Sequence, residues 1–244
     1  MLFLYPNMMF EKTIDPEFHD EMIEADNRGY KTLTCWYARR DTVVTDVVYR
    51  GWMKNAAEYD SFYKSLRYNG MTLINNPQQY NNTHYLHNWY DILAEYTFNT
   101  YFFDTVEDSV NFADSINCSF LLKDDVKSGG IVNGGVELRS ALEKMRKYRG
   151  TDGAGRICLR QYHALDSYSE KRFFCFMGNV FSCDGNVPTI VSEIAKKIDS
   201  NFFSIDIIED IHGKEWLVEI GDGQVSGMKK WTVDKFYEIF GTCK

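Results

Sequence analysis

The pattern of apolar and polar positions divides the chain into short strands and amphipathic helices. In the first third of the chain, runs rich in β-branched and aromatic residues alternate with helical stripes, which indicates an open β-α-β unit. We expect strands at 1–4, 31–37, 42–49 and 71–74 and helices at 15–27 and 59–68.

Further along, the alternation gives way to consecutive strands with short connections. We expect helices at 106–116, 136–148, 187–198 and 233–240, and strands at 118–122, 156–163, 172–177 and 180–183. A second lobe is predicted to begin near Tyr96. Strands that alternate with helices early and become antiparallel later are typical of an α+β fold with packed lobes, and not of one doubly wound sheet.

The stretch 202–227 predicts a hairpin that carries two carboxylates on one face. Residues 202–208 and 215–220 read as strands, and His212-Gly213 reads as the turn between them. A turn centred on that pair places Asp206 directly opposite Glu219, where two like charges destabilise a sheet. A divalent cation would turn this repulsion into ligation. Oxygen ligands suit Mg²⁺, which shares its other positions with water and nucleotide phosphates, so we expect a magnesium-nucleotide site here.

A second interpretation of the same hairpin needs no metal. One of the two carboxylates could be solvated, or paired with Lys214 or Lys229. A register slip of one residue would also send the two side chains to opposite faces. The residues alone leave both interpretations open.

Lys123 stands at the end of a predicted strand, close to the glycine pair Gly129-Gly130. A lysine beside a glycine-rich turn can meet nucleotide phosphates, because the backbone amides supply donors and the lysine supplies a point charge. The spacing is not that of a P-loop. A flexible surface loop is the alternative.

Composition narrows the classes of function. The formal net charge of −8 over 244 residues argues against a main role in binding nucleic-acid backbones or anionic membranes. Six cysteines without a CxxC pair suit reduced thiols, the N-terminus lacks the basic region of a signal peptide, and no apolar run reaches about 18 residues. We therefore expect a soluble cytoplasmic protein.

Several motifs together resemble the ATP-grasp superfamily, and in particular a compact clade named for conserved arginines and a lysine, with members in phages and bacteria. The motifs are YRGWM at 49–53, LINNPQQY, HxxxxWY at 84–90, KDDVKS at 123–128, Arg160, ExR at 170–172, and the pair Asp206 and Glu219 followed by GDGQVSG at 221–227. Their order and spacing cover most of the chain. The resemblance implies a pre-ATP-grasp α/β lobe at 1–95 and an ATP-grasp domain at 96–244, whose two α+β lobes, about 96–162 and 163–244, clamp ATP.

The resemblance also implies roles for individual residues. Lys123 matches the lysine that contacts the ATP phosphates, and Lys127 supports it or faces the substrate. The segment Gln161, Tyr162 and His163 falls where a hinge strand hydrogen-bonds adenine, although an acidic residue is commoner at the position of Gln161.

Asp206 and Glu219 match the magnesium ligands, in agreement with the hairpin geometry. In many relatives the second ligand strand reads ExN, whereas here it reads Glu219-Ile220-Gly221. We therefore expect either Asp222 or a water molecule to supply the remaining oxygen.

Members of this superfamily typically use ATP to join a carboxylate to an amine through an acyl phosphate. This implies ATP and Mg²⁺ as cofactors, and small-molecule or peptide carboxylates and amines, including a peptide or protein end, as substrates. Arg172 and then Arg160 are the candidates for the arginine on the transferring group. Surface ion pairs of these arginines with Glu170 or Asp166 are the alternative.

The substrate residues are expected near the N-terminal lobe. Arg50 is the candidate holder of the carboxylate, and the loop with Gln224 and Ser226 is expected to line the same pocket. The alternative function is a nucleotide-binding module that keeps the fold without ligating, which the irregular ExG favours. A nucleic-acid-modifying enzyme with the same ATP chemistry is a third interpretation, disfavoured by the acidic charge.

Overall fold

The computed structural model describes residues 1–8, 11–35, 45–124, 126, 128–149 and 156–242. The chain divides into two compact units. The N-terminal unit comprises Met1–His84, Lys171–Asp206 and Ile220–Lys244, and the middle unit comprises Tyr85–Glu170 and Ile207–Glu219. The boundary between residues 95 and 96 expected from the resemblance stays a prediction.

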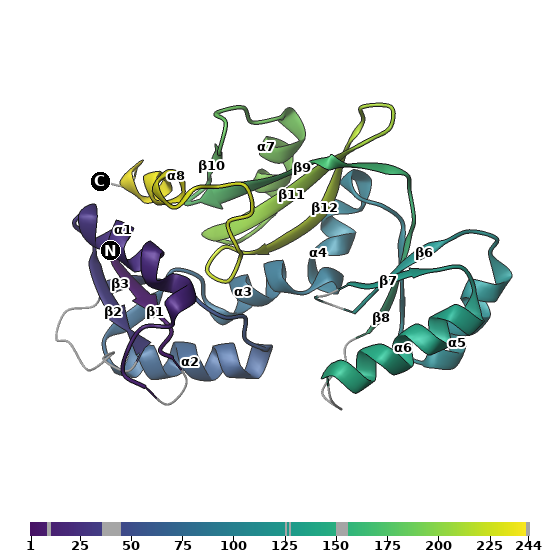
Figure 1. Ribbon diagram of the computed structural model, residues 1–244, viewed down its shortest axis with the longest axis horizontal. Helices are drawn as coiled ribbons and strands as arrows, with labels where there is room; N and C mark the ends of the chain where they lie inside the picture. Colours follow the sequence, from purple (N-terminus) through teal and green to yellow (C-terminus); the bar gives the residue numbers. More distant parts are fainter. Residues whose placement is uncertain (9–10, 36–44, 125, 127, 150–155, 243–244) are drawn as a thin grey trace. The chain divides into compact units, whose positions relative to one another are not determined.

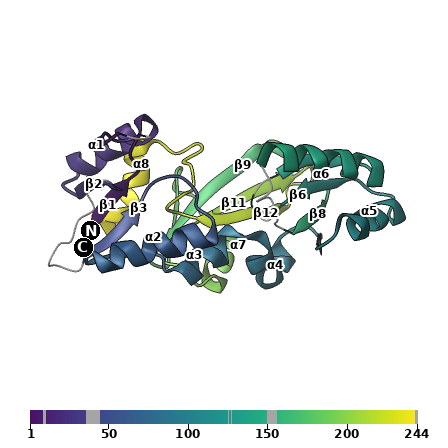
Figure 2. The same cartoon turned by 90° about the horizontal axis from the view of Figure 1, so that it is seen from below.

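A four-stranded parallel sheet forms the start of the N-terminal unit. Its order is β2-β1-β3-β4, with β1 at Leu2–Tyr5, β2 at Lys31–Thr34, β3 at Thr45–Tyr49 and β4 at Met71–Leu73. One face carries α1 (His19–Asn27), which follows the short 3-10 turn η1 (Pro16–Phe18), together with α8 (Val233–Glu238) (Figure 2). The other face carries α2 (Ala56–Tyr68). The β-α-β unit that the sequence predicts is present.

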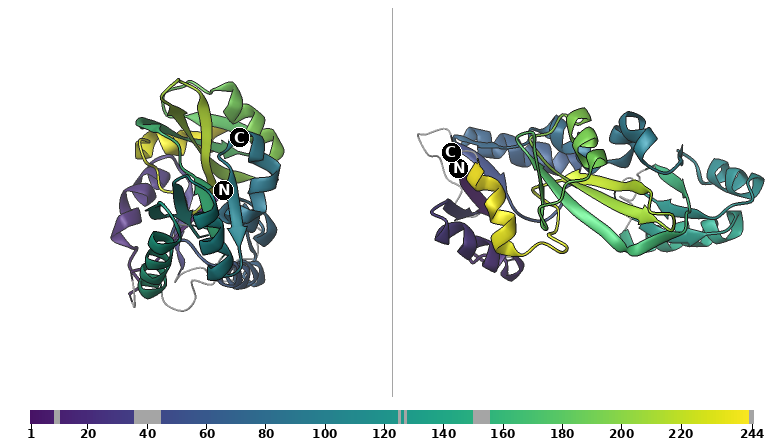
Figure 3. Two further views of the ribbon diagram at one scale, coloured as in Figure 1. Left: turned by 90° about the vertical axis from the view of Figure 1, so that its right-hand side faces the viewer. Right: turned by 90° about the horizontal axis from the view of Figure 1, so that it is seen from above.

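Burial on both faces explains why β1 is apolar throughout. Phe3 and Tyr5 belong to the core shared with α1 and α8, whereas Leu2 and Leu4 belong to the core shared with α2. Adjacent residues of a strand point to opposite faces, so a strand covered on both sides needs a continuous apolar run. The end of the chain returns to this sheet, where α8 and the following turn η4 (Ile239–Thr242) pack against β1 (Figure 3).

The middle unit contains an antiparallel sheet of order β5-β8-β6-β7. Its strands are β5 at Thr100–Phe103, β6 at Phe120–Lys123, β7 at Ser128–Val132 and β8 at Ile157–Gln161. Helices α5 (Val106–Ser115) and α6 (Gly135–Arg149) cover one face (Figure 1). Two further helices, α3 (Pro77–His84) in the N-terminal unit and α4 (Leu86–Leu93) in the middle unit, lie between β4 and β5 in the chain.

Strand β7 differs from the glycine-rich loop that the sequence suggests. It pairs with β6 as an edge strand, with Leu122 opposite Gly130. A side chain at Gly129 would collide with Met145 of α6 and approach Leu122. Glycine here lets the helix pack closely on the strand, so its presence signals a close approach as well as a turn.

The third sheet has the order β10-β9-β11-β12. Its strands are β9 at Leu165–Phe176, β10 at Asn179–Ser182, β11 at Phe202–Asp210 and β12 at Glu215–Asp222, and α7 (Thr189–Lys197) follows β10. Strands β9, β11 and β12 each run from one unit into the other.

The register of the hairpin β11-β12 changes along its length. At the open end, the N–H of Gly223 donates to the carbonyl of Phe202, which is the register expected from a turn centred on His212-Gly213. At the turn, the N–H of Asp210 donates to the carbonyl of Lys214, because Gly213 adopts φ 79° and forms a bulge. The register shifts by one residue between these pairs, so the direct opposition of Asp206 and Glu219 stays a prediction. None of the described helices has the length and apolar character needed to cross a membrane.

Candidate functional site

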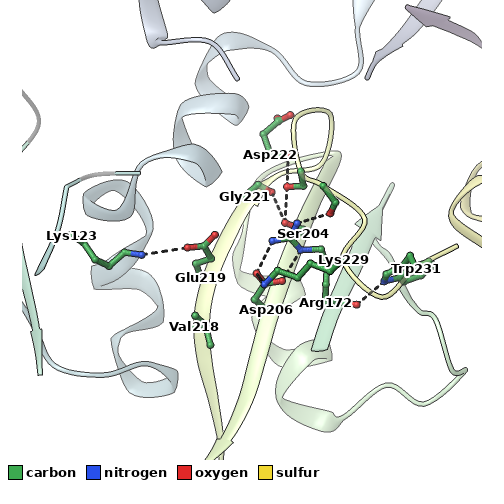
Figure 4. Close-up of polar contacts among 12 residues, drawn as sticks. Lys123, Arg172, Ser204, Asp206, Val218, Glu219, Gly221, Asp222, Lys229 and Trp231 are labelled. Carbon is green, nitrogen blue, oxygen red and sulfur yellow. Dashed lines mark hydrogen bonds and ion pairs between the residues drawn. The ribbon is translucent and has the colours of Figure 1, made fainter. Parts of the chain in front are cut away.

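Lys123 ends strand β6 as a buried cation in the middle unit. Its Nζ lies 3.4 Å from Oε2 of Glu219 (Figure 4). The same Nζ lies 3.2 Å from Oγ of Ser128. Only 5% of its surface is exposed, and this burial lowers the pKa of the ammonium group despite the nearby carboxylate. Lys127, its predicted partner, lies outside the described residues.

Arg160 on β8 is a second buried cation of the same unit. Its Nε donates to Oγ1 of Thr100 at 3.2 Å, and its Nη1 donates to the carbonyl of Val218. Its Nη2 is buried and has no hydrogen-bond partner among the described residues. Burial lowers the pKa of the guanidinium to about 10, although the charge of Glu219 opposes the shift. Two buried cations therefore act on one carboxylate, and one donor atom is left unsatisfied.

The predicted adenine segment continues from β8. The N–H of Gln161 donates to the carbonyl of Asn99 at 2.8 Å, and the N–H of Tyr162 donates to the carbonyl of Ser119 at 2.9 Å. Both backbone N–H groups already donate within the unit, so an adenine base bound here would have to hydrogen-bond to atoms other than these two donors. His163 stacks on the ring of Phe98, with ring centroids 5.0 Å apart. The adenine role of these three residues stays a prediction.

Asp206 on β11 is held by two cations of the N-terminal unit. Arg172 of β9 donates to both carboxylate oxygens, at 2.8 and 2.7 Å, and Nζ of Lys229 lies 2.7 Å from Oδ2 (Figure 4). Asp206 is 1% exposed, whereas 35% of the Lys229 side chain is exposed. Arg172 also donates to the carbonyl of Gly227 at 2.6 Å, and its own carbonyl accepts from the indole of Trp231. Strand β9 and the loop after β12 thus position the pair together.

Asp222 lies in a separate buried network. Its Oδ2 accepts from Nδ2 of Asn75, and its Oδ1 accepts from the backbone N–H and the side-chain amide of Gln224. The amide of Gln224 also donates to the hydroxyl of Tyr59. Both oxygens of Asp222 are therefore engaged inside the core, where its role as a third metal ligand stays a prediction. Gln224, predicted to contact substrate, is likewise fully buried.

The carboxyl group of Asp222 is expected to titrate near neutral pH, because burial raises its pKa from 3.8 to about 7. The folded state then holds this proton more tightly than the unfolded chain. The contribution to stability is full below the unfolded pKa and is lost as the pH rises through the folded pKa, with a slope of at most about 1.4 kcal/mol per pH unit. Carbon-13 NMR of the aspartate carboxyls measures the titration, and Asp222→Asn assigns the signal. If no aspartate carboxyl titrates within about one pH unit of 7, the expected rise in the pKa of Asp222 is contradicted.

Arg50 is engaged by the protein itself. Its Nε and Nη2 donate to the two carboxylate oxygens of Glu21, at 2.8 and 3.1 Å, and both side chains are about 95% buried or more. Its Nη1 donates to the carbonyls of Gly223, Gln224 and Ser226. Burial opposes the charge, but Glu21 raises the pKa of the guanidinium above its usual value. Nη1 thus ties the loop after β12 to the N-terminal sheet, while Nε and Nη2 bind Glu21.

A pocket of about 260 Å³ lies beside this ion pair in the N-terminal unit. Its lining comes from η1, the start of α1, the residues after β3 and the loop after β12, and includes Glu17, Phe18, Arg50, Trp52, Ser226 and Met228. Two predicted substrate residues, Arg50 and Ser226, therefore line one pocket. Ser226 bonds to the carbonyl of Asp222 and the hydroxyl of Ser204 at 2.8 Å each.

Gly221 occupies the place where many relatives carry asparagine. A Cβ atom there would lie 3.1 Å from Oγ of Ser226 and 3.3 Å from Oγ of Ser204. These contacts are tighter than usual, so the side chains around the site suit glycine. A side chain at position 221 would require these two serine hydroxyls to shift by a few tenths of an ångström.

Of two further contributors to the site, sequence reasoning named one and missed the other. Lys229 was named as a possible ion-pair partner of one hairpin carboxylate, and it does pair with Asp206. Its backbone adopts the left-handed φ of 51°, which is uncommon outside glycine. Asn75 was interpreted as part of a turn, yet it bridges Asp222 and the backbone of β11. It lies 147 residues from Asp222 in the chain, and no local sequence pattern predicts a contact at that separation.

The predicted magnesium ligands are two carboxylates, Asp206 in the N-terminal unit and Glu219 in the middle unit. The described residues contain no cluster of three or more His, Cys, Asp and Glu side chains. Magnesium commonly takes only one or two protein carboxylates and fills its other positions with water and phosphate oxygens, so it needs no such cluster, and ligation by Asp206 and Glu219 stays a prediction.

Part of the chain is similar in sequence to a known protein family. Residues 131–239 match the model of an ATP-grasp domain, family 3 of the clade named for conserved arginines and a lysine. No curated protein sequence matches the chain significantly.

Solved structures match over nearly the whole chain. A RimK domain protein ATP-grasp from Sphaerobacter thermophilus has a TM-score of 0.63 at 10% identity, covering 93% of this chain and 92% of its own. D-alanyl-alanine synthetase A from Vibrio cholerae has a TM-score of 0.64 at 11% identity, covering 99% and 92%. The ATP-grasp ligase PsnB, solved with a minimal precursor, Mg and ADP, has a TM-score of 0.58 at 9% identity, covering 99% and 97%.

The protein has the ATP-grasp fold. The structural likeness shows this over the chain as a whole, and the match at 131–239 adds agreement in sequence with the arginine-lysine clade. The α+β class and the ATP-grasp resemblance expected from the sequence are confirmed. At identities near 10% the likeness extends to the fold and not to a substrate.

Proposed function

We propose that the protein is an ATP-dependent ligase that joins a carboxylate to an amine through an acyl phosphate. The observation that carries the proposal is the pair of buried cations in the middle unit. Lys123 and Arg160 act on the single carboxylate of Glu219, and Nη2 of Arg160 is buried without a partner among the described residues. A buried donor of this kind is costly unless an anion satisfies it. The triphosphate of ATP supplies that anion.

The other predicted site residues have separate roles in magnesium binding and phosphoryl transfer. Asp206 and Glu219 hold the magnesium ion, which neutralises phosphate charge when it is bound. Arg172, whose guanidinium is paired with Asp206 and Gly227 in the N-terminal unit, is the candidate to neutralise the phosphoryl group in transfer, and in this role it would exchange its contact with Asp206 for the phosphoryl oxygens. The substrate carboxylate oxygen attacks the γ-phosphorus and ADP leaves. The amine nitrogen then attacks the acyl carbon, phosphate leaves, and the nitrogen loses a proton.

Soluble peptide ends and free amino acids both satisfy this scheme as substrates. The relatives support ligation in general, since those compared above include a D-alanyl-alanine synthetase and a ligase solved with a peptide precursor. A cytoplasmic location is part of the proposal, because ATP is available there.

A nucleotide-binding module without ligase activity is the second candidate. The observation in its favour is Gly221, whose surroundings suit glycine in place of the asparagine that many relatives use. Such a module would bind magnesium-ATP without releasing ADP.

Calorimetric titration with ATP at several magnesium concentrations tests the proposal. We expect wild type to bind, and Glu219→Gln to lose most of its magnesium dependence, because one of two ligand carboxylates is removed. Glu209→Gln serves as the matched control, since Glu209 is exposed on the same hairpin. ADP release is then measured against pools of amino acids and peptides.

Each result has a distinct meaning. Binding together with pool-dependent ADP release supports the ligase. Binding with no ADP release against any pool favours the module. No binding of nucleotide at any magnesium concentration overturns both candidates.

A further inference from the structure

The pocket beside Arg50 has a charge opposite to the one that the sequence suggests. Arg50 was expected to hold a substrate carboxylate, but all three of its guanidinium nitrogens already donate, and its charge is matched by Glu21. Glu21 in turn is 4% exposed and also accepts from the hydroxyl of Tyr237. The ion pair is neutral as a unit, so it offers a carboxylate ligand little attraction.

Glu17 supplies the net charge of the pocket lining. It is exposed, and its carboxylate has no hydrogen bond or ion pair within the described part of the chain. The lining otherwise contains apolar, neutral polar and backbone groups in addition to the neutral pair. A single free carboxylate in such a pocket attracts a cation and repels an anion.

Two aromatic rings stand beside this carboxylate. Phe18 and Trp52 meet edge to face, with ring centroids 5.3 Å apart. The indole N–H of Trp52 donates to Oδ2 of Asp15 at 2.9 Å, which fixes the ring, and 48% of Trp52 remains exposed. Aromatic faces bind ammonium groups as well as apolar groups. Met53, Val225 and Met228 extend the apolar lining.

The volume limits the size of the ligand. Pockets for drug-sized molecules hold about 300–1,000 Å³. At about 260 Å³ this pocket suits one amino-acid-sized group. Its loop is also tied to the proposed catalytic arginine, because Gly227 lines the pocket and accepts from Nη1 of Arg172.

We propose that this pocket binds the amine substrate, as an ammonium group that carries an apolar side chain, with Glu17 and Trp52 as its contacts. That the bound amine is a substrate rests on the proposed ligase function. The binding of an amine by this pocket does not depend on that function. Arg50 and Glu21 hold the wall of the pocket and do not contact the reacting carboxylate.

Two small probes separate an amine site from a carboxylate site. L-leucinamide carries an ammonium group without a carboxylate, and N-acetyl-L-leucine carries a carboxylate without an amine. Calorimetric titration of the nucleotide-free protein is expected to show binding of L-leucinamide and none of N-acetyl-L-leucine. Equal or tighter binding of N-acetyl-L-leucine would overturn the proposal, and so would failure of both probes to bind.

Matched variants locate the binding. Glu17→Gln is expected to weaken L-leucinamide binding about fivefold, the value of an exposed ion pair near 1 kcal/mol. Trp52→Leu is expected to weaken it by a similar factor through loss of the cation–π contact. Asp20→Asn removes a charge next to the pocket from an exposed residue that does not line it, and should leave binding unchanged. Equal weakening by Asp20→Asn would show a general charge effect and refute the site.

Failure of this inference is distinguishable from failure of the ligase proposal. If magnesium-ATP binds and ADP is released with some substrate pool while L-leucinamide does not bind, the pocket assignment is wrong and the ligase stands. If L-leucinamide binds in the Glu17-dependent way and magnesium-ATP binds with no ADP release against any pool, the pocket stands as an amine site and the module without ligase activity is favoured.

Discussion

Arg50→Ala is expected to lower the free energy of unfolding by about 3–5 kcal/mol. The substitution leaves the carboxylate of Glu21 buried without its cation, and it removes the donors to the carbonyls of Gly223, Gln224 and Ser226. An uncompensated buried charge costs far more than a lost surface contact. Urea unfolding followed by circular dichroism measures the change.

Two controls test the physical cause. Lys64→Ala breaks an exposed ion pair with Asp60 on α2 and should cost no more than about 0.5 kcal/mol. The double variant Glu21→Leu with Arg50→Met replaces the buried pair by apolar groups and should recover much of the lost stability. A loss for Arg50→Ala as small as that for Lys64→Ala would show that the pair does not hold the loop.

Arg172→Gln is expected to reduce turnover of ATP by about a thousandfold or more, because a guanidinium on a phosphoryl group in transfer typically contributes that much. Its bidentate contact with Asp206 and its bond to Gly227 position it for this role. The kcat for ADP release measures the effect with the substrate pool that supports wild type. Binding of magnesium-ATP should fall far less than kcat, which distinguishes lost catalysis from a lost fold.

Two neighbouring substitutions sharpen this test. Lys171→Gln changes the adjacent residue of β9, whose ammonium group pairs with Asp184, and should leave kcat nearly unchanged. Arg172→Lys keeps the charge without the planar fork and should recover only part of the activity. The role is refuted if Arg172→Gln retains kcat within about threefold of wild type.

Most helices and strands of the N-terminal unit follow from local pattern, although α3 was not predicted. The apolar run of β1 and the helical stripe of α2 predict their elements, and the capping box between Asn55 and Glu58 fixes where α2 begins. Strand β7 was missed because its glycines look like a loop in the sequence. Their need is visible only where Met145 of α6 packs against Gly129.

The candidate site divides in the same way. Lys123, Arg172, Asp206 and Glu219 could be named from the sequence because their residue types and order carry the chemistry. The contacts of Lys123 with Glu219 and of Arg172 with Asp206 show which charges meet within each unit. Magnesium ligation itself remains a prediction for the titration experiment.

By itself the sequence determined the α+β class, most of the elements and the residue types available for phosphate and metal chemistry, because periodicity and composition are local properties. Tertiary structure alone decided how the charges are used. Arg50, predicted at a substrate carboxylate, is paired with Glu21, 29 residues away, and Asp222 accepts a hydrogen bond from Asn75, 147 residues away. Burial and long-range pairing set the charge of a pocket, and neither is visible in the order of residues along the chain.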